Sequence, residues 1–192
     1  MTIKTEKPNI VRISFHQEHG DPHYGSCVWA YFDFDLDKYM LNIQSDAGDA
    51  SYRWVATPDH ESFLHLMARV NDDYLMNKLF RETVVDEEAT RKALNECLAE
   101  MELDEDEINE AAEALEYIFD DYNVERNIGL AQAIVEKWNS DNDLCIDEAY
   151  SYVQTDFTAG EKRIVQIFAD YIQPKIQELV KAGEQLGEVG NA

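Results

Sequence analysis

The chain has 192 residues, of which 45% are hydrophobic and 11% aromatic, and it carries 40 acidic residues against 16 Lys and Arg. This length and apolar content suffice for a sizeable core, which excludes acidic disorder. The net charge of −24 argues against direct binding to nucleic acid or anionic membranes, and it favours basic protein partners.

Four β-strands are predicted in the first third of the chain, where β-branched and aromatic residues alternate with polar ones. In the second strand this alternation places Ala30, Phe32 and Phe34 on one face and Asp33 and Asp35 on the other. Turn residues separate these runs, at His19–Pro22 after the first and at Ser45–Asp49 after the third, which predicts an antiparallel β-meander. The predicted strands are Asn9–His16, Cys27–Leu36, Tyr39–Gln44 and Ser51–Val55.

Helical periodicity replaces this alternation from Thr57 onward, where Thr57 and Pro58 provide an N-cap and a first-turn proline. A short helix over Tyr74–Phe80 is expected next. Apolar residues three and four positions apart then predict amphipathic helices. These run from Ala89 to Met101, from Ile108 to Tyr122 and from Ile164 to Val180.

Two of these helices are preceded by capping-box sequences, Asp104 with Glu107 and Thr158 with Glu161. Pro174 is expected to kink the last helix. Strands followed by four to six helices predict an α+β fold, with helices covering one face of the sheet and an acidic helical face.

We expect a single domain over residues 1–192, with a sheet-rich part at about 9–56 and a helical part at about 57–186. A division near residue 83 is the alternative. No Gly/Pro-rich linker marks such a division, which favours one continuous domain.

The negative charge is concentrated in residues 86–125, which hold sixteen acids and two bases. Glu110, Glu113 and Glu116 lie three apart without a Lys among them, whereas an ordinary solvated helix face mixes signs. As one helix, Ala93–Glu125 would span about 50 Å and average one carboxylate per about 4 Å, near the roughly 3.4 Å per phosphate of a DNA strand. Two folded-back helices would present a patch instead. Calcium buffers and chaperone-like proteins reach similar densities.

Two groups are candidate metal ligands. Asp33, Asp35 and Asp37 share a strand face, but Lys38 and Gln44 occupy positions where an EF-hand needs Gly and Glu, so a polar sheet face is favoured. The second group is formed by three turn histidines, which could hold zinc but are more often simply exposed. These are His16, His19 and His23.

Sequence signatures of catalysis are absent: there is no GxSxG, no phosphate-binding GxxxxGK[ST] and no GxGxxG. We therefore expect no enzyme, no cofactor and no metal. Cys27, Cys97 and Cys145 form no CxxC pair and are expected to be buried apolar residues. The chain shows neither a secretory signal nor an apolar run long enough to span a bilayer, so a cytoplasmic location is expected.

The segment CVWAYFDFDLDKYMLNIQSDAGDASYRW, followed by ESFLHLMARVNDDYLMNKLF, resembles small acidic proteins carried by prophages and plasmids. Among these, it is similar to anti-CRISPR proteins that inhibit type II RNA-guided nucleases, which implies that the cytoplasm in question is that of a bacterial host cell. The resemblance covers residues of about 9–82 best.

The resemblance implies a protein that binds the effector nuclease and inhibits it. Such an effector reads DNA with Arg side chains and holds it in a positively charged channel, for which a DNA-mimicking carboxylate surface could compete. The alternatives are an anti-restriction protein, another acidic adaptor and, with less support, a metal-dependent enzyme. The predicted contact residues are Glu100, Glu102, Asp104, Glu105, Asp106, Glu107, Glu110, Glu113, Glu116, Asp120 and Asp121.

Overall fold

The computed structural model describes residues 2–5, 7–56 and 61–189, with side chains described up to Gly183. The chain divides into two compact units. We call Met1–Arg81 together with Ala159–Ala192 the sheet unit, and Glu82–Thr158 the inserted unit, because it interrupts the sheet unit in the sequence.

The sheet unit is built on a four-stranded antiparallel sheet in the order β1-β2-β3-β4. Ala30, Phe32 and Phe34 of the second strand are completely buried, which confirms the predicted alternation. The meander and the α+β class are confirmed as well, with strand ends within about two residues of the prediction. The strands are β1 (Ile10–His16), β2 (Trp29–Asp35), β3 (Met40–Ser45) and β4 (Ala50–Arg53).

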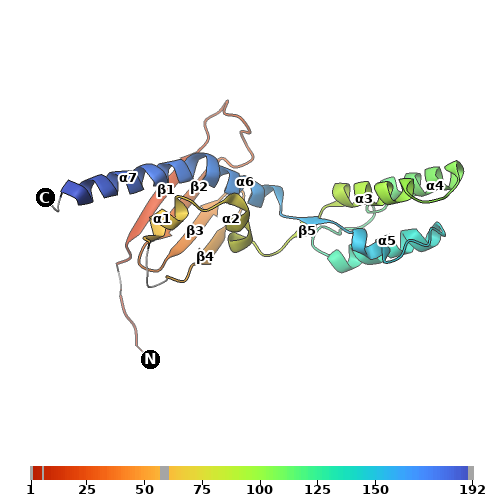
Figure 1. The fold of residues 1–192 in the computed structure, drawn as a ribbon, viewed down its shortest axis with the longest axis horizontal. Coiled ribbons are helices and arrows are strands. Elements are labelled where there is room, and N and C mark those ends of the chain that lie inside the picture. The colour runs from red at the N-terminus through yellow and green to blue at the C-terminus, as the bar shows by residue number, and fades with distance from the viewer. Residues whose placement is uncertain (1, 6, 57–60, 190–192) are drawn as a thin grey trace. The chain divides into compact units, whose positions relative to one another are not determined.

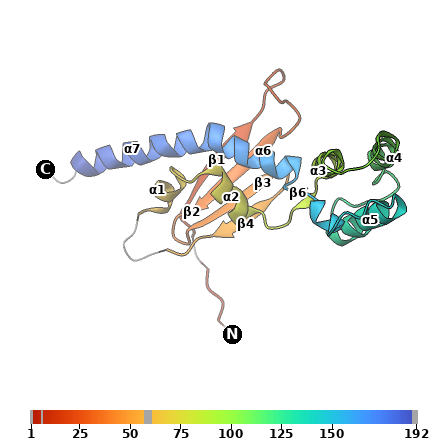
Figure 2. The ribbon, with the colours of Figure 1, turned by 45° about the vertical axis from the view of Figure 1, so that its right-hand side comes forward.

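Helices cover one face of this sheet, as Figures 1 and 2 show. Phe32 faces Phe168 with ring centroids 6.2 Å apart, and Phe34 faces Phe63 at the same distance. The sheet therefore joins helices from both parts of the unit into one core. They are α1 (Phe63–Met67), α2 (Asp72–Leu79), α6 (Ala159–Ile167) and α7 (Gln173–Val189), with a π-helical turn, η2 (Phe168–Ile172), between the last two.

The helix starts differ in part from the predicted ones. The predicted cap at Thr57 and Pro58 lies outside the described residues, and α1 begins at Phe63, where the Ser62 side chain accepts a hydrogen bond from His65 N–H. Helix α6 begins directly after Thr158. At Pro174 the helix continues, and the irregularity next to it is the preceding π-helical turn, since both a proline and a π-bulge disturb the regular i→i−4 bonding.

Gly160 allows the start of α6 to approach the β3–β4 turn closely. A Cβ at this position would lie 2.4 Å from the backbone oxygen of Ala47. No real Cβ fits at that distance, so the contact between α6 and the sheet requires glycine.

The inserted unit is a small helical body with its own core. Its entering and leaving segments pair as a two-stranded antiparallel ladder, β5 (Val84–Val85) with β6 (Thr155–Asp156). Its core holds Leu94, Leu98, Leu115, Phe119 and Trp138 among others. The helices are α3 (Glu87–Ala99), α4 (Glu105–Glu116), α5 (Ile128–Asp141) and the short 3₁₀ turn η1 (Ala149–Tyr152).

These units do not coincide with the predicted sheet-rich and helical parts. The first boundary falls close to residue 83, the alternative considered above, but the helices from Ala159 onward return to the sheet. Helix α5 was not predicted, and α4 ends at Glu116, several residues before the predicted end at Tyr122.

Candidate protein-binding surface

The inserted unit contains most of the negative charge of the protein. Its 77 residues, 82–158, hold twenty-three acids and four bases, a net charge of −19. The sheet unit holds seventeen acids and twelve bases over the remaining 115 residues, a net charge of −5. The boundary between the two compact units is therefore also a boundary in charge.

All eleven predicted contact residues lie in the inserted unit, and all are exposed. We call this set the acidic surface. It follows the chain from the C-cap of α3 at Glu100, through the α3–α4 turn and α4, to Asp120 and Asp121 in the turn after α4.

Some of these acids have structural roles. The Asp104 side chain accepts a hydrogen bond from Glu107 N–H at 2.9 Å, and the Glu107 side chain accepts one from Asp104 N–H at 3.2 Å. This is the predicted capping box, and it is confirmed. Asp120 lies 3.6 Å from the Arg91 guanidinium. In the part of the chain that the structure describes, no other member of the acidic surface has a basic side chain within ion-pair distance.

Helix α4 presents its carboxylates away from the core. Its inner face is marked by buried Ala111 and Leu115. Asp106, Glu110 and Glu113 follow each other at spacings of four and three residues, which places them on the opposite face. Each of these carboxylates therefore has like-charged neighbours one turn away.

The C-terminal turns of the helices in the inserted unit also lack the basic residues that would favour them. Helices α3, α4 and α5 have no basic residue in their last turns. The last turn of α4 instead contains Glu113 and Glu116, and a helix C-terminus disfavours negative charge. Local helix stability therefore does not explain why carboxylates occupy these positions.

The acidic surface is a patch and not a line. Leu94 and Leu98 of α3 share one core with Ala111 and Leu115 of α4, so the two helices fold back on each other. The linear spacing calculated for a single extended helix does not apply. A patch of carboxylates is better suited to a concave or broad basic surface.

Exposed tyrosines lie among the acids, which sequence reasoning missed. Tyr117 is 63% exposed, and Tyr122 and Tyr150 are also exposed. The charge of Glu148 is the main reason why the pKa of the Tyr150 hydroxyl is raised. Tyrosine next to carboxylates provides apolar contact area and hydrogen bonding, as is common in protein interfaces.

The candidate metal ligands in the sheet unit have other contacts. Asp33 receives two hydrogen bonds of 2.6 Å from the Arg12 guanidinium across the β1–β2 pair. Asp35 is buried and accepts from Lys38 N–H at 3.0 Å, which fixes the β2–β3 turn. His16 packs on Tyr31 and His19 on Tyr24. Among the described residues, no three His, Cys, Asp or Glu side chains gather as metal ligands would.

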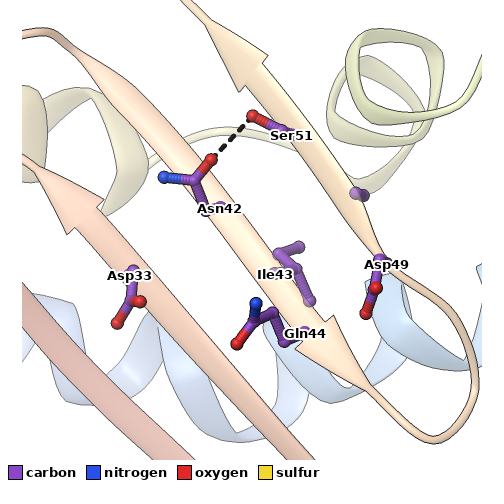
Figure 3. Close-up of a pocket in the computed structure, with 7 residues that line it drawn as sticks. Asp33, Asn42, Ile43, Gln44, Asp49 and Ser51 are labelled. Atoms are coloured by element: carbon purple, nitrogen blue, oxygen red, sulfur yellow. Dashed lines mark hydrogen bonds between the residues drawn. The ribbon is translucent and has the colours of Figure 1, made fainter.

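The face of the sheet that bears Asp33 holds an open depression of about 500 Å³, shown in Figure 3. Asn42 and Ser51 point toward one another across β3 and β4, and the Ser51 hydroxyl donates a 2.7 Å hydrogen bond to the Asn42 side chain. Gln44 lies further along β3, and Asp49 lies in the turn just before β4. This is the polar sheet face that the alternation predicted.

The prediction that all three cysteines are buried is wrong for Cys145, which is exposed, and only partly right for Cys97, which is half-buried. Cys27 is buried, and desolvation raises the pKa of its thiol to about 11. Cys145 lies in the segment after α5, where Leu144 takes the buried position next to it.

Together, the fold and this surface define an α+β protein with a strongly acidic inserted unit. A family model described as a phage family matches residues 1–178, and the chain belongs to this phage family. The matched range includes both units and extends well beyond the residues that carried the resemblance. No curated protein and no solved structure matches the chain. Within the described residues, no helix has the length and apolarity to cross a lipid bilayer.

Proposed function

We propose that this phage protein inhibits a nucleic-acid-processing enzyme of the bacterial host by binding its positively charged nucleic-acid site through the acidic surface. The target that we favour is the effector nuclease of a type II CRISPR system, which would make the protein an anti-CRISPR. It would then act in the host cytoplasm, as a binding protein without catalysis of its own.

The observation that carries this proposal is the segregation of charge. A net −19 in 77 residues lies on one compact unit, with carboxylates at helix C-termini that the helix itself disfavours. A basic partner would relieve this repulsion on binding. Exposed acids that served only to keep the protein in solution would not need to be concentrated in this way.

A type II effector offers the complementary chemistry. Arg side chains read its adjacent motif, and a positively charged channel holds the RNA–DNA heteroduplex. Arginine guanidinium groups donate hydrogen bonds to carboxylates in the same forked geometry in which they donate to phosphate or guanine. A carboxylate patch that occupies these groups would exclude DNA without resembling a base sequence.

The test is a charge reversal that leaves the capping box intact. Glu110, Glu113 and Glu116 are changed together to Lys, and the matched control changes Glu18, Asp37 and Asp170 of the sheet unit to Lys. Both triple variants change the net charge by the same amount at exposed acids. Binding to a type II effector with guide RNA, and the exclusion of target DNA, are measured at low and high salt.

We expect the inserted-unit variant to lose binding and inhibition while the control keeps both, and wild-type binding to weaken steeply with salt. If inhibition survives the inserted-unit reversal, the acidic surface is not the binding site. If wild type binds no effector, the anti-CRISPR assignment fails. An anti-restriction function would use the same surface, and competition with DNA for a restriction enzyme would reveal it.

A further inference from the structure

The inserted unit also contains a groove with an apolar floor. It lies between α4 and α5, has a volume of about 320 Å³ and is at the lower end of the size range of ligand sites. Its floor is formed by Ile118, Ile134 and Trp138. These three side chains are almost entirely buried and leave only a small apolar surface at the bottom of the groove.

A hydrogen bond links the two helices at the floor of the groove. The Trp138 indole N–H donates a 3.1 Å hydrogen bond to the backbone oxygen of Ala111, so α5 is fixed to α4 directly beneath the groove. Ala114 forms part of the α4 wall, and its small side chain leaves the space open. A larger residue at this position would fill it.

The rim of the groove is polar. Lys137 forms an ion pair with Asp141 one turn along α5, and the exposed Tyr122 stands at the α4 side. Glu110 precedes Ala114 by one helical turn, and Asp121 adjoins Tyr122 in the sequence. The surroundings therefore carry net negative charge around an apolar centre.

We propose that this groove receives an apolar side chain from a basic segment of the partner protein. Charge complementarity argues for this occupant, because Lys or Arg residues beside the apolar side chain would meet Glu110, Asp121 and Asp141. A central apolar anchor inside a polar rim is a usual arrangement in protein interfaces. The inference rests on the proposed function and adds a contact that the partner's own nucleic acid cannot offer, because a phosphate backbone has no apolar groove to receive such a side chain.

The test uses two synthetic amphipathic peptides of equal positive charge, one with Leu on its apolar face and one with Ala at the same positions. Calorimetry gives the affinity of each for the full-length protein, and NMR follows the methyl groups of Ile118 and Ile134. We expect the Leu peptide to bind at least about tenfold more tightly and to shift both methyl signals. Ala114→Trp should abolish this advantage, whereas Ala99→Trp, at an exposed alanine of α3, no residue of which lines the groove, should preserve it.

Equal affinities for the two peptides would overturn the inference and leave the electrostatic proposal standing. An advantage for the Leu peptide that persists in Ala114→Trp would also overturn it, since the apolar contact would then lie elsewhere. If neither peptide binds at low salt, both the groove and the proposed binding of basic partners fail. The comparison of peptides on the wild-type protein does not depend on the folding of any variant.

Discussion

The unfavourable placement of acids on α4 predicts that one charge reversal will stabilise the protein. Glu113 has like-charged neighbours at Glu110 and Glu116, each three residues away, and lies in the last turn of the helix. Glu113→Lys converts both repulsive pairs into attractive ones. Each pair contributes about 0.2–0.5 kcal/mol in either direction, and a cation in the last turn adds about 0.3–1 kcal/mol.

The summed increase in the free energy of unfolding is therefore about 1–3 kcal/mol at low salt. Glu113→Gln removes the repulsion without adding attraction, and we expect roughly half of the effect. Urea unfolding followed by circular dichroism measures the change in midpoint, and hydrogen exchange of the α4 backbone amides shows where it arises. In 1 M salt, where the Debye length is about 3 Å, the gain should largely disappear.

Glu18→Lys serves as the control, because it makes the same charge change in a loop of the sheet unit. Its midpoint should stay close to that of the wild type. A lower midpoint for Glu113→Lys, or a gain that is unchanged in 1 M salt, would refute the reasoning that these carboxylates oppose the stability of their own helix.

Three further predictions concern the sheet unit and the cysteines. Gly160→Ala should destabilise the protein by about 1–3 kcal/mol because of its 2.4 Å approach to backbone, whereas Gly183→Ala, with open space around it, should stabilise by up to about 1 kcal/mol. Iodoacetamide labelling followed by mass spectrometry should modify Cys145 first and Cys27 last, since Cys27 is buried and has a thiol pKa of about 11. Desolvation opposes ionisation of Asp46, but hydrogen bonds from the backbone N–H groups of Val28 and Trp29 outweigh it and lower the pKa of this carboxyl group below its ordinary value of 3.8. The ionised Asp46 therefore stabilises the fold at neutral pH, and this stabilisation is lost as the carboxylate becomes protonated. The gap in urea midpoint between wild type and Asp46→Asn should close as the pH falls below 3.8.

The sheet was predictable because its signal is local. The alternation that buries Phe32 and Phe34 is readable in seven consecutive residues, and the capping box at Asp104 in four. Helix α5 also has a local sequence pattern, although it was not predicted. Ala131, Ile134, Val135 and Trp138 recur at three, four and seven residues, and the Asn127 side chain caps the helix.

The division into units was not readable from such patterns. Phe168 packs on Phe32, 136 positions earlier in the chain, and local periodicity does not specify that contact. The return of α6 and α7 to the sheet is therefore a tertiary result. The acidic residues were identified from the sequence. Their confinement to one compact unit depends on the separate core of Glu82–Thr158, which is a property of the tertiary structure.

The same side chains link the stability of the protein to its binding. Burial of Leu115 and Trp138 in a core of fourteen residues holds the inserted unit together, and the exposed carboxylates weaken it. Glu113→Lys should therefore raise stability and weaken binding to a basic partner, effects of opposite sign from one substitution. If the carboxylate had only a structural role, its reversal would change stability and binding in the same direction. Measuring the two effects on one variant thus separates an acidic surface that exists for a partner from one that exists for the fold.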